Sequence, residues 1–290
     1  MIGRLIAITT TLAAIASQPP QQLTFRSGIE LVEIDAAVMR DNQPVVGLTA
    51  ADFRVDDNGV EQQIQTVALE RLPLSVTMAL DVSSSVNGDR LAQLLAAANG
   101  LVDALRVDDS AALVTFSHEV SLNVPLSRDR TALREGLAAV RAGGATALRD
   151  AVQLVLPVAA AAPGSRALLL LFTDGRDTVS WVSEEDVVDS ARKSAVVVHA
   201  IDVRTPDDMG SAAFLDHLAG ATGGRRWSAA SDRDLRRLFT QALEEMRSRY
   251  LLTFSPAGKR TAGWHTLKVS LRNGRADISA RPGYYVPPTK

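Results

Sequence analysis

The sequence predicts an α/β protein in which a doubly wound, mostly parallel sheet is inserted in a smaller, β-sandwich-like domain. Two observations predict the sheet: four solidly apolar runs, and apolar residues at helical spacing between them. A third, the alternation of apolar and polar residues near both ends of the chain, is typical of strands with one solvated face. Strands and helices in alternation form a parallel sheet covered by helices. We therefore expect residues 72–249 to form the α/β domain.

The N-terminal β segment is expected over residues 18–71. Apolar and polar positions alternate around Ile34, around Phe53 and around Val67. The pair Asn58 and Gly59 lies between two of these stretches, and Asn-Gly favours a two-residue hairpin. This segment should be antiparallel.

The apolar runs of the α/β domain are too uniform for strands with one solvated face, so we expect them to be buried on both faces. They span residues 74–81, 111–116, 167–172 and 195–203. Ser183 stands three positions before Asp186, and Ser231 three before Asp234, near the pattern of a capped helix start. Pro157 falls about three turns into the helix expected from Ala147, and should kink or end it.

The C-terminal β segment, residues 250–290, returns to alternation and contains a turn at Asn273 and Gly274. The simplest arrangement pairs this segment with residues 18–71. The alternative is two separate β extensions, each short of core.

Composition excludes several classes of protein. The 290 residues are 46% hydrophobic, which is ample for a core, and the net charge is −2 with no block of like charges. Nucleic acid is therefore a poor candidate partner. The chain has no cysteine, so it can form no disulfide.

Residues 1–17 have the parts of a secretory signal peptide. Arg4 precedes an apolar run, and Ala14-Ile15-Ala16 resembles a cleavage site. We expect a secreted or periplasmic protein with no integral membrane segment after cleavage. The alternative is a membrane anchor, although the run is short for about 30 Å of hydrocarbon.

Three polar motifs follow strands at the same expected edge of the sheet. Asp81, Ser83 and Ser85 form a D-x-S-x-S pattern after the first buried run, Thr146 follows a Gly-Gly pair, and Asp174 ends a later run. Ligands of open α/β sheets bind at the carboxyl ends of the strands. Taken singly, the serines could cap a helix and Asp174 could form a turn.

Together these residues resemble the metal-ion-dependent adhesion site (MIDAS) of von Willebrand factor type A (VWFA) domains, which are Rossmann-like. The resemblance implies that Ser83, Ser85 and Thr146 supply hydroxyl oxygens to a divalent ion, with Asp81 and Asp174 binding it directly or through water. The flanking segments, including residues 281–286, also resemble secreted bacterial VWFA-related proteins of the Acidobacterial type.

A set of hydroxyl and carboxylate oxygens suits Mg²⁺ first, with Mn²⁺ or Ca²⁺ as alternatives, and disfavours zinc. We expect a secreted, non-enzymatic protein-binding or adhesion module that binds a Glu or Asp of a protein partner through the ion. The alternatives are a metal-dependent hydrolase, which needs a general base, and a domain that uses the metal only for stability.

The remaining motifs say less about function. The four histidines have no metal-ligand or triad spacing, and His199, in a buried run, is expected to be a satisfied core residue. The sequence contains no G-x-S-x-G, and neither the P-loop pattern nor G-x-G-x-x-G follows an expected strand. Asp150, one turn after Thr146, is not assigned to the ion. By analogy with the family, the last helix, from Ser231 to about Arg249, could report occupancy of the site.

Overall fold

The structure is a computed structural model. It describes residues 31–41, 43–69, 72–161, 164–174, 177–203, 209–257 and 261–288. The expected signal peptide, residues 1–17, lies outside the described residues. None of the helices in the described part of the chain is long and apolar enough to span a membrane.

The core of the molecule is a six-stranded sheet with the order β11-β10-β9-β6-β7-β8. Its strands are β6 (Leu74–Asp81), β7 (Ser110–Phe116), β8 (Val120–Ser127), β9 (Arg166–Thr173), β10 (Val197–Val203) and β11 (Arg226–Ala229). Neighbouring strands are parallel except β8, which runs antiparallel to β7. The predicted α/β fold is confirmed, and the four apolar runs are its four inner strands.

Two edge strands, β8 and β11, were not predicted, and the expectation of strict strand and helix alternation was wrong at β8. This strand follows β7 directly, without a helix. Its sequence contains Pro125, and only Val124 among its residues is buried, so it lacks the apolar signature of the inner strands. Proline is tolerated here because β8 is an edge strand whose pairing with β7 is irregular.

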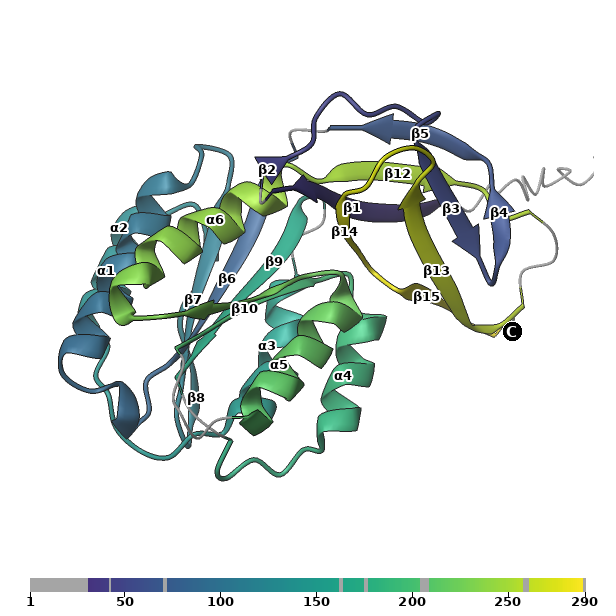
Figure 1. The fold of residues 1–290 in the computed structure, drawn as a ribbon. Helices are drawn as coiled ribbons and strands as arrows, with labels where there is room; N and C mark the ends of the chain where they lie inside the picture. The colour runs from purple at the N-terminus through teal and green to yellow at the C-terminus, as the bar shows by residue number, and fades with distance from the viewer. Residues whose placement is uncertain are drawn as a thin grey trace, which may run out of the picture.

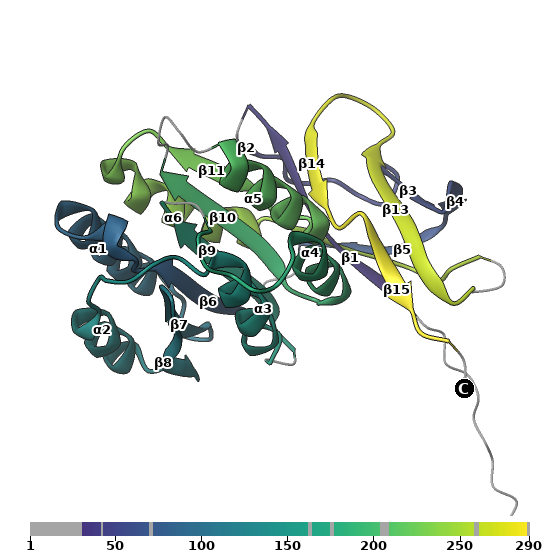
Figure 2. The ribbon, with the colours of Figure 1, turned by 90° about the horizontal axis from the view of Figure 1, so that it is seen from below.

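Helices cover both faces of this sheet (Figures 1 and 2). One apolar cluster joins the sheet to α1 (Asp89–Ala104), α2 (Arg130–Ala139) and α6 (Leu235–Arg247). A second joins the opposite face to α3 (Leu148–Ala159), α4 (Glu184–Lys193) and α5 (Met209–Thr222). The sheet is therefore buried on both faces, as its apolar strands require.

The predicted helix ends are partly confirmed. The Ser183 side chain caps α4 by accepting the N–H of Asp186 at 3.1 Å. Ser231 instead precedes a short 3₁₀ turn (Asp232–Asp234), so α6 begins later than expected, at Leu235. Pro157 lies inside α3, which ends two residues later at Ala159.

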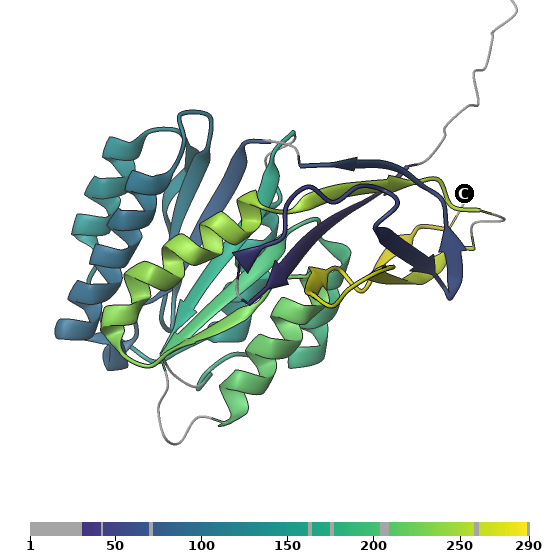
Figure 3. The same cartoon turned by 45° about the horizontal axis from the view of Figure 1, so that its top comes forward.

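The remaining strands form a second unit, called here the β-frame, which lies at one end of the α/β domain (Figure 3). They are β1 (Val32–Arg40), β2 (Gln43–Pro44), β3 (Phe53–Asp57), β4 (Val60–Gln62), β5 (Ile64–Ala68), β12 (Tyr250–Phe254), β13 (Gly263–Leu271), β14 (Asp277–Ala280) and β15 (Gly283–Val286).

Strands from the two ends of the chain pair within the β-frame. The β-frame contains two sheets. In one sheet β1 lies between β12 and β14, and in the other β3 pairs with β13; all these pairs are antiparallel. Apolar residues of the two sheets pack in one cluster that includes Ile34, Phe53 and Tyr250. The expected hairpin joins β3 to β4, where Asn58 and Gly59 have φ of 47° and 80°.

The β-frame meets the α/β domain at the amino ends of the parallel strands. Arg166, the first residue of β9, forms an ion pair with Asp35 of β1 at 2.9 Å. Gly223 has φ of +75°, and a Cβ there would lie 2.4 Å from the backbone nitrogen of Arg281. This close approach requires glycine.

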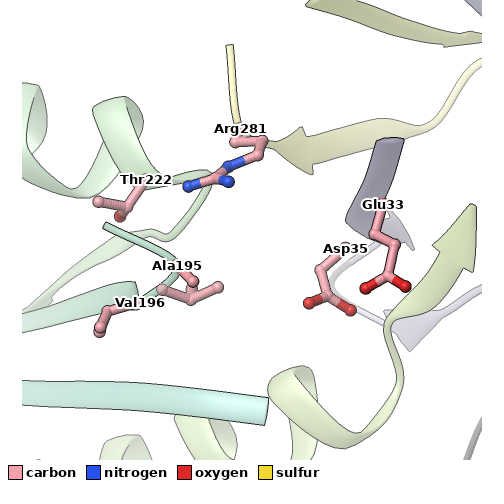
Figure 4. Close-up of a pocket in the computed structure, with 7 residues that line it drawn as sticks. Glu33, Asp35, Ala195, Val196, Thr222 and Arg281 are labelled. Carbon is pink, nitrogen blue, oxygen red and sulfur yellow. The ribbon is translucent and has the colours of Figure 1, made fainter. Parts of the chain in front are cut away.

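A small pocket of about 140 Å³ lies at this junction. Figure 4 shows Arg281 on one side of it, with Glu33 and Asp35 on the other. Burial lowers the pKa of Arg281, although Asp35 opposes the shift. The pocket adjoins the first residues of β10, Val197 included, and so belongs to the amino edge of the sheet.

Candidate metal centre

The carboxyl ends of two neighbouring strands bring the predicted acidic residues together. Asp81 is the last residue of β6, and Asp174 directly follows β9. The two strands are parallel neighbours, with Leu80 opposite Phe172. Both carboxylates therefore lie at one edge of the sheet, at the opposite end of the α/β domain from the β-frame (Figure 1).

Asp81 is fully buried and is held by two hydrogen bonds. Its Oδ1 accepts the backbone N–H of Ser83 at 2.9 Å, and its Oδ2 accepts the Thr173 hydroxyl at 2.7 Å. Burial raises the pKa of Asp81 above its usual range, although the hydrogen bonds from Thr173 and Ser83 oppose the shift. A carboxylate in this position gains from a nearby cation.

Hydrogen bonds link the two serines of the motif to the second carboxylate. The hydroxyl oxygens of Ser83 and Ser85 lie 3.1 Å apart. The Ser85 hydroxyl donates to Oδ1 of Asp174 at 2.8 Å. Asp174 is only 3% exposed, whereas Ser85 is exposed. These side chains form a continuous row of oxygens that reaches the surface.

The loop that carries Thr146 lies against the D-x-S-x-S loop. Gly143 donates its N–H to the carbonyl of Val82 at 2.7 Å, and Ser84 donates to the carbonyl of Gly144 at 2.9 Å. Thr146 itself is 5% exposed. The structure therefore brings all five predicted residues to one edge of the sheet, and hydrogen bonds connect four of them, Asp81, Ser83, Ser85 and Asp174.

Gly144 is required for this contact between loops. It has φ of +87°, and a Cβ there would lie 2.1 Å from Nδ1 of His118. No other residue type fits both constraints without displacing His118. The second glycine of the Gly-Gly pair is therefore required sterically, whereas a Cβ on Gly143 would meet nothing within 4 Å.

Sequence reasoning missed two residues of the site. The guanidinium of Arg90, in the first turn of α1, forms an ion pair with Oδ2 of Asp174. No pattern in the sequence pointed to Arg90. Thr173, which binds Asp81, had a signal, because it stands directly before Asp174 in the same motif.

The donors fit a hard divalent cation. Asp81 and Asp174 place two buried carboxylates in one cluster, and Arg90 supplies one positive charge. Hydroxyl and carboxylate oxygens are the ligands that Mg²⁺, Mn²⁺ and Ca²⁺ prefer. When bound, such an ion would supply an electrophilic centre at the carboxyl edge of the sheet.

Other polar residues singled out from the sequence have contacts elsewhere. Asp150 accepts the backbone N–H groups of Trp181 and Val182 at 3.0 and 2.9 Å. His199 is fully buried and its Nε2 lies 2.7 Å from Oε2 of Glu245, which confirms a satisfied core residue.

A family model described as von Willebrand factor type A domain matches residues 75–241, from β6 into α6. Among curated proteins, the uncharacterized protein sll0103 of Synechocystis sp. is 31% identical over 110 residues, 37% of this chain and 26% of that protein. Inter-alpha-trypsin inhibitor heavy chain H4 of Bos taurus is 25% identical over 226 residues, 74% of this chain and 24% of that protein. The chain spans about a quarter of the length of these relatives.

Solved structures share the fold. Proximal thread matrix protein 1 from the mussel byssus, in a form whose MIDAS motif is occupied by zinc, superposes with a TM-score of 0.55 at 18% identity. That alignment covers 64% of this chain and 48% of the mussel chain. An aerotolerance-related membrane protein from Bacteroides fragilis gives a TM-score of 0.50 at 17% identity and covers 59% of this chain and 99% of its own.

Proposed function

Because this chain belongs to the von Willebrand factor type A domain family, we propose that it binds a divalent cation, Mg²⁺ first, and uses it to hold an acidic side chain of a protein partner. Asp81, Ser83, Ser85, Thr146 and Asp174 would hold the ion. The activity proposed is binding, without a chemical reaction.

One observation carries this proposal: the row of oxygens from Asp81 through Ser83 and Ser85 to Asp174. Both ends of the row are buried carboxylates, and Ser85, which lies between them, is exposed. Two buried carboxylates in one cluster repel each other, and a divalent cation relieves that repulsion. The exposed side of the row, at Ser85, would leave a coordination position for the partner's Glu or Asp.

The test is thermal unfolding of the full chain in EDTA and in Mg²⁺, Mn²⁺ or Ca²⁺. A ligand that binds only the folded state raises the unfolding temperature. We expect Mg²⁺ to stabilise the wild type and to leave the S83A and D174A variants unaffected. S84A is the matched control, because Ser84 is exposed and lies between the two serines of the motif.

The outcomes separate the alternatives. If no divalent ion stabilises the wild type, the metal site is refuted. If the ion binds but no partner is recovered with it, the metal serves stability alone. Partner recovery is measured by a pull-down from the source organism's envelope and culture medium, with D174A as control. A metal-dependent hydrolysis of an ester or peptide bond would contradict the non-enzymatic proposal.

Export from the cytoplasm is part of the same proposal. Its support is the pattern of residues 1–17, with Arg4 before an apolar run. Mass spectrometry of the protein purified from its native source tests it. A mature chain beginning after about residue 17 is expected, and a cytoplasmic chain that keeps Met1 would refute it.

A further inference from the structure

The loop between β9 and α4 carries the most exposed large apolar side chain in the described part of the molecule. Trp181 is 95% exposed. Val179, two residues before it, is 43% exposed. An indole left in water is unusual for a monomer, and Trp is among the residues that dominate the energy of protein interfaces.

The backbone around Trp181 is fixed by hydrogen bonds to the start of α3. The N–H groups of Trp181 and Val182 both donate to the Asp150 carboxylate, at 3.0 and 2.9 Å. The N–H of Ser180 donates to Oδ1 of Asp177 at 3.0 Å. The Ser180 hydroxyl in turn accepts the N–H of Arg149 at 3.1 Å. Trp181 therefore projects from a fixed base.

The same loop is bonded directly to a proposed metal ligand. The N–H of Thr178 donates to the carbonyl of Thr146 at 2.8 Å. The N–H of Thr146 donates back to the Thr178 hydroxyl at 3.1 Å. Asp150, which holds Trp181, lies one helical turn after Thr146 on α3. The exposed indole and the proposed ion thus share one framework at the same edge of the sheet.

We propose that Trp181 is the second contact of the acidic partner, which presents an apolar pocket for the indole beside the Glu or Asp that meets the ion. This inference rests on the proposed metal-dependent binding. The partner's carboxylate makes binding depend on the ion, and contact with the indole of Trp181 distinguishes one acidic partner from another. Because the loop is already ordered, docking the indole costs little conformational entropy.

Val107 provides a matched comparison within the same domain. It is 88% exposed and lies in the turn between α1 and β7, at the amino edge of the sheet. That edge is remote from Asp81 and Thr146. If exposed apolar surface in general promoted binding, substitution of either residue would weaken it. If Trp181 is a docking contact, only its substitution would do so.

The experiment uses a library of constrained peptides displayed on phage, each with a fixed central Glu and random neighbours. The library is selected on the full chain in Mg²⁺, in parallel on wild type, W181A, V107A and D174A. We expect wild type and V107A to enrich the same peptides, with apolar or aromatic residues near the Glu. The best peptide should bind W181A about 30-fold more weakly, with the Mg²⁺ requirement unchanged.

Each result decides a different point. If W181A enriches the same peptides with the same affinity, the docking role of Trp181 is refuted and metal-dependent binding stands. If wild type enriches nothing that D174A fails to enrich, metal-dependent binding fails and the docking role fails with it. If sedimentation shows a wild-type dimer that W181A converts to a monomer, Trp181 contacts a second copy, which also refutes the proposal. The unfolding temperature of W181A should equal that of wild type, since the side chain is exposed.

Discussion

The guanidinium of Arg90 forms an ion pair with Oδ2 of Asp174, whose other oxygen accepts the Ser85 hydroxyl at 2.8 Å. Both oxygens of this carboxylate are therefore engaged within the chain. The Asp174 side chain is fully buried and that of Arg90 is 26% exposed, so bulk water screens the pair incompletely. A divalent cation that binds Asp174 must therefore compete with the guanidinium of Arg90.

Removal of this competitor should strengthen metal binding. In the R90A variant, Asp174 loses its counter-ion and the site loses a positive charge that repels the metal. We expect the dissociation constant for Mg²⁺, measured by isothermal titration calorimetry, to fall at least about tenfold. R134A is the control, because Arg134 of α2 pairs with Asp103, near the far end of α1, through two exposed side chains. An unchanged or weaker affinity in R90A would show that Arg90 supports the site instead of competing for it.

The sequence was sufficient to predict the inner strands of the sheet and the placement of Asp81 and Asp174 at one edge, for physical reasons. Inner strands are buried on both faces, so the runs at 74–81 and 167–172 stand out as apolar throughout. The edge strands β8 and β11 have no such requirement and were missed. Asp81 and Asp174 were predictable as neighbours, because parallel strands end at a common edge.

The contacts that complete the site could not be predicted, because they depend on tertiary geometry. Arg90 is separated from Asp174 by 84 positions and carries no motif. Asp150 was recognised as lying one turn after Thr146, yet its partner, Trp181, follows 31 positions later. A single sequence does not specify which loop a carboxylate will reach.

The anchoring of the Trp181 loop by Asp150 gives a local prediction. In D150A the N–H groups of Trp181 and Val182 lose a charged acceptor, a hydrogen bond of about 1.5–3 kcal/mol. Their hydrogen exchange should accelerate by roughly 10- to 100-fold, read by mass spectrometry or NMR. D189A is the control, because Asp189 pairs with Lys193 on the exposed side of α4. Equal protection in D150A and wild type would mean that the loop is held by its other bonds.

Glu245, near the end of α6, lies in a buried ionic network at the base of the α/β domain. Its Oε1 accepts from Arg249 at 2.9 Å, and its Oε2 lies 2.7 Å from Nε2 of His199. Arg249 also donates to the carbonyl of Gly223 at 2.7 Å and is fully buried. The network joins α6 to β10 and to the turn against which the β-frame packs.

Truncation of Glu245 should therefore destabilise the folded protein strongly. E245A leaves the Arg249 charge buried without its partner, and we expect a loss of about 3–5 kcal/mol in the free energy of unfolding. Chemical denaturation measures it. E244A is the matched control: the neighbouring Glu244 side chain is 57% exposed in its pair with Arg247, so a loss below about 1 kcal/mol is expected. Similar losses in the two variants would mean that water reaches Arg249 when Glu245 is removed.

The same network should make the free energy of unfolding depend on pH, and the direction of that dependence follows from its contacts. Nδ1 of His199 accepts the backbone N–H of Arg225 at 3.0 Å, so Nε2 carries the proton donated to Glu245 and the ring is neutral. Burial lowers the pKa of His199 below 6.5, although Glu245 opposes the shift. Burial by itself would raise the pKa of Glu245, but the charge of Arg249 and the hydrogen bonds from His199 and Arg249 outweigh it and lower the pKa.

His199 has a pKa of about 6.5 in the unfolded chain and a lower pKa in the folded chain. Between these two values, the unfolded chain binds a proton at His199 that the folded chain does not. The free energy of unfolding should therefore fall as the pH drops below about 6.5, with a slope from this one group of at most about 1.4 kcal/mol per pH unit. In H199Q a neutral amide can accept from Arg225 and donate to Glu245, without titrating. Denaturant unfolding of both proteins between pH 7.5 and pH 5 should give the smaller slope for H199Q. Equal slopes would show that proton uptake by other groups accounts for the acid sensitivity.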